Sequence, residues 1–170
     1  MTFSERDIRI LSLLYPPFKE MTKRFMVLCW EAGLPVRLTN GLRTFAEQDE
    51  LLAKGTQVTK AKGGYSYHNY GIAFDICFGN FDDGKTPNPY VEPVAMAWEK
   101  CARIGLRCGL QPGYMWTSFQ DKPHYQANIK ASISDLRSAF LKGGTIGLYD
   151  FLNTHEKDSF FLPPSAATLE

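Results

Sequence analysis

The chain has 170 residues, enough for one domain with a hydrophobic core and too few for two full-sized domains. A hydrophobic fraction of 44% and a charged fraction of 22% are typical of a soluble globular protein and exclude a disordered chain. The formal net charge is +1 and no basic block of the kind that follows a phosphate backbone occurs, so we expect no nucleic-acid partner.

The N-terminal third is predicted to be helical before the chain enters a sheet. Apolar residues recur at three- and four-residue steps over residues 4–32, which predicts one helix or two joined helices, interrupted at Pro16-Pro17. A short strand is expected over residues 35–39. The run Thr44-Phe-Ala-Glu47 has the spacing of a capping box and predicts a helix over residues 45–54. Arg43 then lies just before the helix N-terminus, where its side chain can point into a cleft.

The middle of the chain contains a strand with an unusual residue in it. Residues 56–66 are rich in Lys, Gly and Thr and predict an exposed, mobile loop. From Gly71 onward the pattern has period two, so Ala73, Asp75 and Cys77 share one face of a predicted strand. A carboxylate in an apolar strand costs several kcal/mol to bury unless it is paired, hydrogen-bonded or bound to a metal. Asp75 is therefore a candidate functional residue.

The C-terminal half is predicted to contain three helices. A turn-rich loop over residues 79–90 leads to a helix over residues 91–104, with Pro93 in its first turn. A further strand is expected to begin at residues 106–108, followed by an irregular stretch. Two short helices are predicted over residues 134–142 and 146–152, separated by Gly143-Gly144. We divide the chain into one domain over residues 1–155 and a C-terminal tail over residues 156–170.

The N-terminus and the cysteines bear on the compartment. The first seven residues lack the basic and then apolar pattern of a signal peptide, and no segment approaches the ~20 apolar residues that cross a bilayer. We therefore expect a protein that is made in the cytoplasm and does not insert into a membrane. The cysteines form no Cys-x-x-Cys pair, which favours buried free thiols; they are Cys29, Cys77, Cys101 and Cys108.

Two clusters of polar residues are candidates for chemistry. One runs from Ser66 through His68 to Asp75, and the other is Asp121-Lys-Pro-His124. Zinc accepts imidazole nitrogen and carboxylate oxygen, and a catalytic zinc site keeps one of its four positions open for water. A further carboxylate near that water can take its proton. Taken singly, each of these residues also fits a structural role. No short metal motif such as His-Glu-x-x-His occurs, so spacing alone leaves a metal site and structural roles as open alternatives.

The ordered pattern of these residues resembles a known family. Ser66-x-His68-x-x-Gly71-x-Ala73-x-Asp75, followed by a distant Asp-x-Pro-His, resembles the LAS-type zinc peptidases, which cut peptidoglycan stem peptides. The likeness extends upstream to Gly41-Leu-Arg43-Thr and covers roughly residues 15–128. It implies an α+β fold in a single domain, with a small antiparallel sheet flanked by helices. This is the fold of the hedgehog/D-Ala-D-Ala-peptidase type.

The resemblance also implies roles for individual residues. His68, Asp75 and His124 match the ligands of one zinc ion, and Asp121 matches the catalytic base. Arg43 matches an arginine that holds or polarises carboxylate or carbonyl groups of the substrate, which suits a planar, permanently charged donor.

Two further residues in the matching segments are candidates for substrate binding. Gln48 and Ser66 could contact the substrate backbone. The alternatives are an exposed helix residue at Gln48 and a loop-stabilising hydrogen bond at Ser66.

The residue three positions before the last histidine indicates the subclass. Enzymes for D-alanyl-D-alanine usually have Glu there, whereas Asp121 resembles the endopeptidases that cut between L-alanine and D-glutamate. We therefore expect an endolysin-like L-alanyl-D-glutamate endopeptidase. The alternatives are a D-alanyl-D-alanine carboxypeptidase or dipeptidase, and a non-catalytic zinc-containing module that binds the cell wall.

The expected partner is a peptidoglycan stem peptide, and the expected state is a monomer. The protein would act on the wall once released or exported, or on imported wall fragments.

One region departs from the family pattern. Where relatives carry a Trp-Gly-Gly-Asp-Trp-like stretch, residues 108–116 differ, and we expect this loop to line the cleft and to affect substrate preference.

Overall fold

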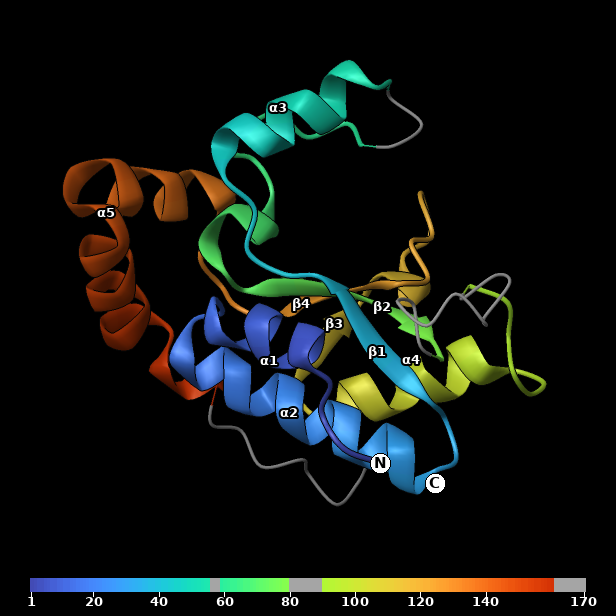
Figure 1. Ribbon diagram of the computed structural model, residues 1–170. Coiled ribbons are helices and arrows are strands. Elements are labelled where there is room, and N and C mark those ends of the chain that lie inside the picture. The colour runs from blue at the N-terminus through green and yellow to red at the C-terminus, as the bar shows by residue number, and fades with distance from the viewer. Residues whose placement is uncertain (56–58, 80–89, 161–170) are drawn as a thin grey trace.

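The computed structural model describes residues 1–55, 59–79 and 90–160. Within these ranges the chain forms a four-stranded antiparallel sheet in the order β1-β2-β4-β3, with helices packed against it (Figure 1). The strands are β1 (Val36–Asn40), β2 (Ala73–Phe78), β3 (Leu110–Pro112) and β4 (His124–Ala127). The predicted α+β class with a small antiparallel sheet is confirmed. None of the helices in the described ranges is long and apolar enough to cross a bilayer.

The N-terminal helical region consists of two helices, α1 (Glu5–Ser12) and α2 (Pro16–Glu31). The predicted break at the proline pair is confirmed, because Pro16 and Pro17 occupy the first turn of α2, where a missing N–H costs nothing. A capping box begins α1: the Ser4 side chain accepts a hydrogen bond from the Asp7 N–H, and the Asp7 carboxylate accepts one from the Ser4 N–H.

Asp7 also joins α1 to the sheet. Its side chain is fully buried, and its Oδ1 accepts a hydrogen bond from the Leu38 N–H of β1 at 2.9 Å. Its Oδ2 accepts another from Arg37 Nη1, also at 2.9 Å. Both oxygens of this buried carboxylate thus accept hydrogen bonds.

Replacing Asp7 with Ala should lower the free energy of unfolding by about 3 kcal/mol, because a buried strand N–H and an Arg lose their acceptor together. Urea unfolding followed by circular dichroism measures this loss. Asp135→Ala is the matched control, since Asp135 fills the same capping-box position in another helix but is exposed, and its loss should be much smaller. Equal losses for the two variants would contradict the role of Asp7 as a link to the sheet.

The hydrophobic core lies between the sheet and α2. Phe74 of β2 and Tyr125 of β4 are register partners, and their rings stack at 5.3 Å between centroids. Phe25 of α2 contacts both rings, at 5.5 and 4.6 Å. Behind them α4 (Ala97–Arg107) packs on α2, where the Sγ atoms of Cys29 and Cys101 lie 3.9 Å apart. All four cysteines are buried and free, as predicted.

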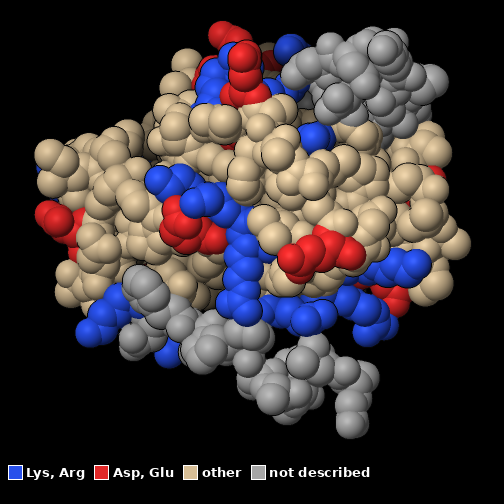
Figure 2. All heavy atoms as spheres, turned by 60° about the horizontal axis from the view of Figure 1, so that its bottom comes forward, with Lys and Arg blue, Asp and Glu red and all other residues tan. Residues whose placement is uncertain are grey.

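The outer side of these helices faces solvent. Figure 2 shows the side at the bottom of Figure 1, where basic and acidic side chains lie among uncharged ones. Ion pairs one helical turn apart join Glu20 to Lys23 and Glu99 to Arg103, with N–O distances of 2.9 and 2.8 Å. Such pairs near the surface contribute little to stability.

Three elements differ from the expectation. The helix predicted from residue 91 begins at Ala97, because Glu92 turns back and accepts a hydrogen bond from the Trp98 N–H at 3.1 Å. Pro93 also disfavours helical backbone at the residue before it. The helix then continues to Arg107, so the strand expected at residues 106–108 is wrong and β3 begins at Leu110. No strand was expected at β4, because four residues are too few to show the alternation of apolar and polar side chains that predicts a strand.

Two helices flank the remaining sides of the molecule (Figure 1). The capping box predicted at Thr44 and Glu47 is confirmed and begins α3 (Phe45–Ala53). The two helices expected after residue 133 form one bent element, α5 (Ile133–His155). Its backbone departs from helical values at Gly143 and Gly144, the pair expected to separate them.

The chain remains packed beyond α5. Glu156 is buried, and its carboxylate accepts hydrogen bonds from the N–H groups of Lys130 and Ala131 at 3.1 and 2.7 Å. The ring of Phe160 is buried and lies 5.0 Å from that of Tyr15. The packed part of the chain therefore extends through residues 156–160, which were expected to belong to the tail. Residues 161–170 lie outside the described ranges, as do 56–58 and 80–89 of the predicted loops.

Candidate metal centre

Two strands and one turn bring His68, Asp75 and His124 together. Asp75 and His124 are register partners across β2 and β4. His68 lies in the short 3-10 helix η1 (Tyr67–Tyr70), directly before β2. One ligand atom from each residue lies within 4.8 Å of the other two. The turn into β2 depends on Gly71, which has φ +65° and whose added Cβ would lie 3.1 Å from the carbonyl oxygen of Leu13.

Hydrogen bonds fix which nitrogen of each imidazole faces the cluster. His68 Nδ1 donates to the carbonyl oxygen of Gly41 at 2.8 Å, which leaves Nε2 as the ligand atom. His124 has the opposite orientation: its Nε2 lies 3.0 Å from Gln126 Oε1, and its Nδ1 lies 3.2 Å from His68 Nε2. Asp75 Oδ1 is 3.3 Å from His68 Nε2 and 3.2 Å from His124 Nδ1. Three lone pairs therefore face one point.

The second oxygen of Asp75 is held from the other side. Asp75 Oδ2 accepts a hydrogen bond from Asn40 Nδ2 at 3.1 Å and lies 3.7 Å from Arg43 Nη2. Burial alone raises the pKa of Asp75, but the His68 and His124 imidazoles outweigh it and hold this pKa well below the usual range. The carboxylate is thus ionised and oriented with one oxygen toward the histidines. Asn40 is a site residue that the sequence analysis missed.

The electrostatics of the cluster favour a cation. Burial lowers the pKa of His124, but the adjacent Asp75 carboxylate outweighs burial and raises it above the ordinary value. Positive charge is therefore stabilised at the point where the three ligand atoms meet. Two imidazole nitrogens and one carboxylate oxygen, each with its outer atom hydrogen-bonded, fit a divalent metal with an open position.

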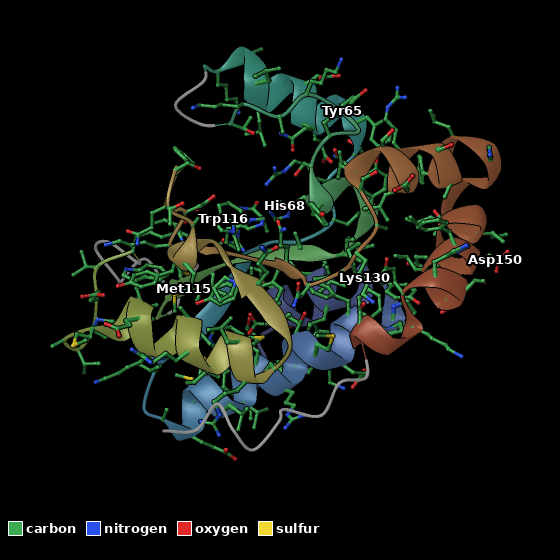
Figure 3. The ribbon with its side chains drawn as sticks, turned by 180° about the vertical axis from the view of Figure 1, so that it is seen from behind. Tyr65, His68, Met115, Trp116, Lys130 and Asp150 are labelled. Atoms are coloured by element: carbon green, nitrogen blue, oxygen red, sulfur yellow. The ribbon has the colours of Figure 1, made fainter. Side chains whose placement is uncertain are left out.

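The three residues lie in a cleft of about 550 Å³. His68 lies between the side chains of Tyr65 and Trp116 in Figure 3, and all three line the cleft. Among the other predicted site residues, those that line the cleft are Arg43, Ser66, Asp75, Asp121 and His124. The predicted contribution of residues 108–116 to the cleft is confirmed by Trp116, whose ring centroid is 5.2 Å from that of His124.

Backbone hydrogen bonds connect Asp121 to His124 of the His-Asp-His cluster and to Gly113. Its N–H donates to the carbonyl oxygen of Gly113 at 3.0 Å, and its own carbonyl accepts from the His124 N–H at 3.2 Å. Burial raises the pKa of the Asp121 carboxyl group, and the nearby His124 opposes this shift without reversing it. The cleft therefore contains a carboxyl group of raised pKa beside the His-Asp-His cluster.

Gln48 and Ser66 differ in their access to the cleft. Gln48 is fully buried: its Oε1 accepts from Arg43 Nη1 at 2.8 Å, and its Nε2 donates to the carbonyl oxygen of Ala61 at 2.8 Å. It thus contacts Arg43 and the segment after α3 rather than the cleft. The Ser66 hydroxyl accepts a hydrogen bond from the His68 N–H at 3.4 Å and caps η1.

Two residues outside the sequence-based candidates approach each other in the cleft lining. Lys60 follows α3 and Phe119 precedes β4, and Lys60 Nζ lies 5.6 Å from the centroid of the Phe119 ring. Neither residue belongs to a recognisable motif, so no sequence signal pointed to this contact.

An α+β fold with a His-Asp-His cluster and a carboxyl group in one cleft is an arrangement typical of metallopeptidases. A family profile described as D-alanyl-D-alanine carboxypeptidase matches residues 59–127, which contain the three candidate ligands and Asp121. The peptidoglycan L-alanyl-D-glutamate endopeptidase CwlK of Bacillus subtilis (strain 168) is 32% identical over 135 residues, 71% of this chain and 77% of CwlK. The chain therefore belongs to the LAS-type peptidoglycan peptidases.

A solved structure shares the fold. The crystal structure of the Serratia marcescens L-Ala D-Glu endopeptidase ChiX matches with a TM-score of 0.53 and 23% sequence identity. The match covers 74% of this chain and 89% of ChiX. The sheet and the surrounding helices are thus an arrangement that this peptidase also has.

Proposed function

We propose that the protein is a zinc-dependent L-alanyl-D-glutamate endopeptidase that acts on peptidoglycan stem peptides. The relationship to CwlK carries this proposal, because that protein is named for this bond and the match spans most of both chains. The Asp rather than Glu at position 121 agrees with it. All candidate ligands and the candidate base lie in one cleft of a single chain, so we propose that a monomer acts on the cell wall or its fragments.

The metal would be held by His68 Nε2, Asp75 Oδ1 and His124 Nδ1. Zinc, when bound, supplies Lewis acidity that polarises the scissile carbonyl and makes the attacking water more acidic. Asn40 and Arg43 keep the second oxygen of Asp75 occupied, so the carboxylate offers a single oxygen to the metal. The three candidate ligand atoms thus lie together before a metal enters.

Asp121 is proposed as the base. A carboxyl group with a raised pKa accepts a proton from water more readily than an ordinary Asp does, and it can then deliver that proton to the leaving amine. Arg43 lines the cleft and offers a charged, planar set of donors for a carbonyl or carboxylate of the substrate. Gln48 holds the Arg43 guanidinium in place from behind.

Product masses from a defined muropeptide test the proposal. Incubation with the zinc-loaded protein should release a fragment that begins at D-glutamate, and prior treatment with a chelator should abolish release until zinc is added back. Loss of a single terminal alanine would instead identify a D-alanyl-D-alanine carboxypeptidase. Binding to wall sacculi without new amino groups would identify a non-catalytic module.

A further inference from the structure

Two amide side chains, those of Gln126 and Gln111, lie beside the His-Asp-His cluster on the same face of the sheet. Gln126 follows His124 by two residues on β4, so both side chains point to the same face. Its register partner on β3 is Gln111, and its register partner on β2 is Ala73, whose side chain is small. Gln126 is buried at 8% exposure, so water competes little for its amide. The sheet thus places an amide beside one ligand and a second amide beside the first.

One hydrogen bond joins the two amides. Gln126 Nε2 donates to Gln111 Oε1 at 2.8 Å. Gln126 Oε1 is then the atom that faces His124 Nε2, at 3.0 Å, and an amide oxygen can only accept. His124 therefore carries a proton on Nε2, and its Nδ1 is the ring nitrogen that faces Asp75 and His68, where a metal would bind.

We propose that Gln126, oriented by Gln111, is a positioning residue that fixes the tautomer and ring plane of His124 so that Nδ1 binds the metal. The inference rests on the metal site of the proposed function and is independent of which bond is cut. An amide acceptor is neutral, so His124 remains a neutral ligand and Asp75 remains the single anionic one. The backbone carbonyl of Gly41 fixes His68 through Nδ1, and the side chain of Gln126 fixes His124 through Nε2.

The zinc affinities of the unaltered protein and of three variants test this role. Gln126→Leu keeps the side-chain volume but removes the acceptor, and we expect its zinc dissociation constant to rise 10–100-fold in a competition titration with a chelator. Gln126→Glu keeps an acceptor for the His124 Nε2–H and should retain tight binding, because the Gln111 amide can turn its NH₂ toward the carboxylate. Gln120→Leu removes an exposed amide that bonds to the Tyr114 carbonyl and should bind zinc like the unaltered protein.

Thermal unfolding of the zinc-free proteins separates positioning from packing. We expect the Leu and Glu variants at position 126 to unfold at similar temperatures without metal and to differ only in zinc affinity. Unchanged zinc affinity in Gln126→Leu, or equal losses in the Leu and Glu variants, would overturn the positioning role. Zinc binding that depends on Gln126 without hydrolysis of any muropeptide would overturn the proposed function and leave this role intact. An unaltered protein that binds no zinc would overturn both.

Discussion

Replacing Asp121 with Asn should lower the rate of stem-peptide hydrolysis by ~10²–10⁴-fold while zinc remains bound. Asn has nearly the volume of Asp but cannot accept the proton of the attacking water. The three ligand atoms come from other residues, so the metal should be retained. The backbone hydrogen bonds that join this position to Gly113 and His124 do not depend on the side chain and should persist.

The measurement is kcat/KM on the muropeptide together with zinc content by mass spectrometry. Asp121→Ala should behave like the Asn variant, because both lack a base. Asp135→Asn is a suitable control, since that carboxylate caps α5 and does not line the cleft. A variant at position 121 that kept the full rate would show that another group takes the proton.

Gly113→Ala should reduce kcat/KM by at least ~10²-fold, although residue 113 carries no chemistry of its own. A Cβ at this position would lie 2.5 Å from the carbonyl oxygen of Asp121 and 3.2 Å from the Cβ of His124. The first distance is far below van der Waals contact with a backbone atom that cannot rotate away. The segment that carries the proposed base and one proposed ligand must therefore shift, and misplacement by about 1 Å costs ~10²-fold in rate.

Kinetics and zinc affinity together test this steric effect. The variant should bind zinc more weakly and hydrolyse the muropeptide more slowly, with unfolding free energy lowered by ~1–3 kcal/mol, the usual range for overpacking. Gly143→Ala is the matched control, because an added Cβ there meets no atom within 4 Å and φ is −141°. Normal activity in Gly113→Ala would contradict the close approach of the two segments.

The sequence predicted best those elements whose determinants lie within a few adjacent residues. The capping box at Thr44 and Glu47 and the proline pair before α2 act within one turn of helix. The period-two pattern around Asp75 likewise depends on adjacent residues. The start of α4 was misjudged because Glu92 caps it from six residues before Trp98, a contact that helical periodicity does not reveal.

The candidate site divides in the same way. His68, Asp75, His124 and Asp121 stood out because they are functional groups in an ordered motif, and the structure brings the first three together. The residues that support them were missed because their roles arise from pairing across strands or from close approach of distant segments; they are Asn40, Gly113, Gln111 and Gln126. Strand register and backbone contact are properties of the folded chain and leave no pattern in a single sequence.

The contact between Lys60 and Phe119 is a weak link across the lining of the cleft. It joins the segment after α3 to the segment before β4, and both residues line the cleft. An exposed cation–π contact contributes ~0.5–1 kcal/mol, close to thermal energy. Breaking this contact would therefore cost a bound peptide little, and the elements that carry the candidate metal ligands, η1, β2 and β4, contain neither residue.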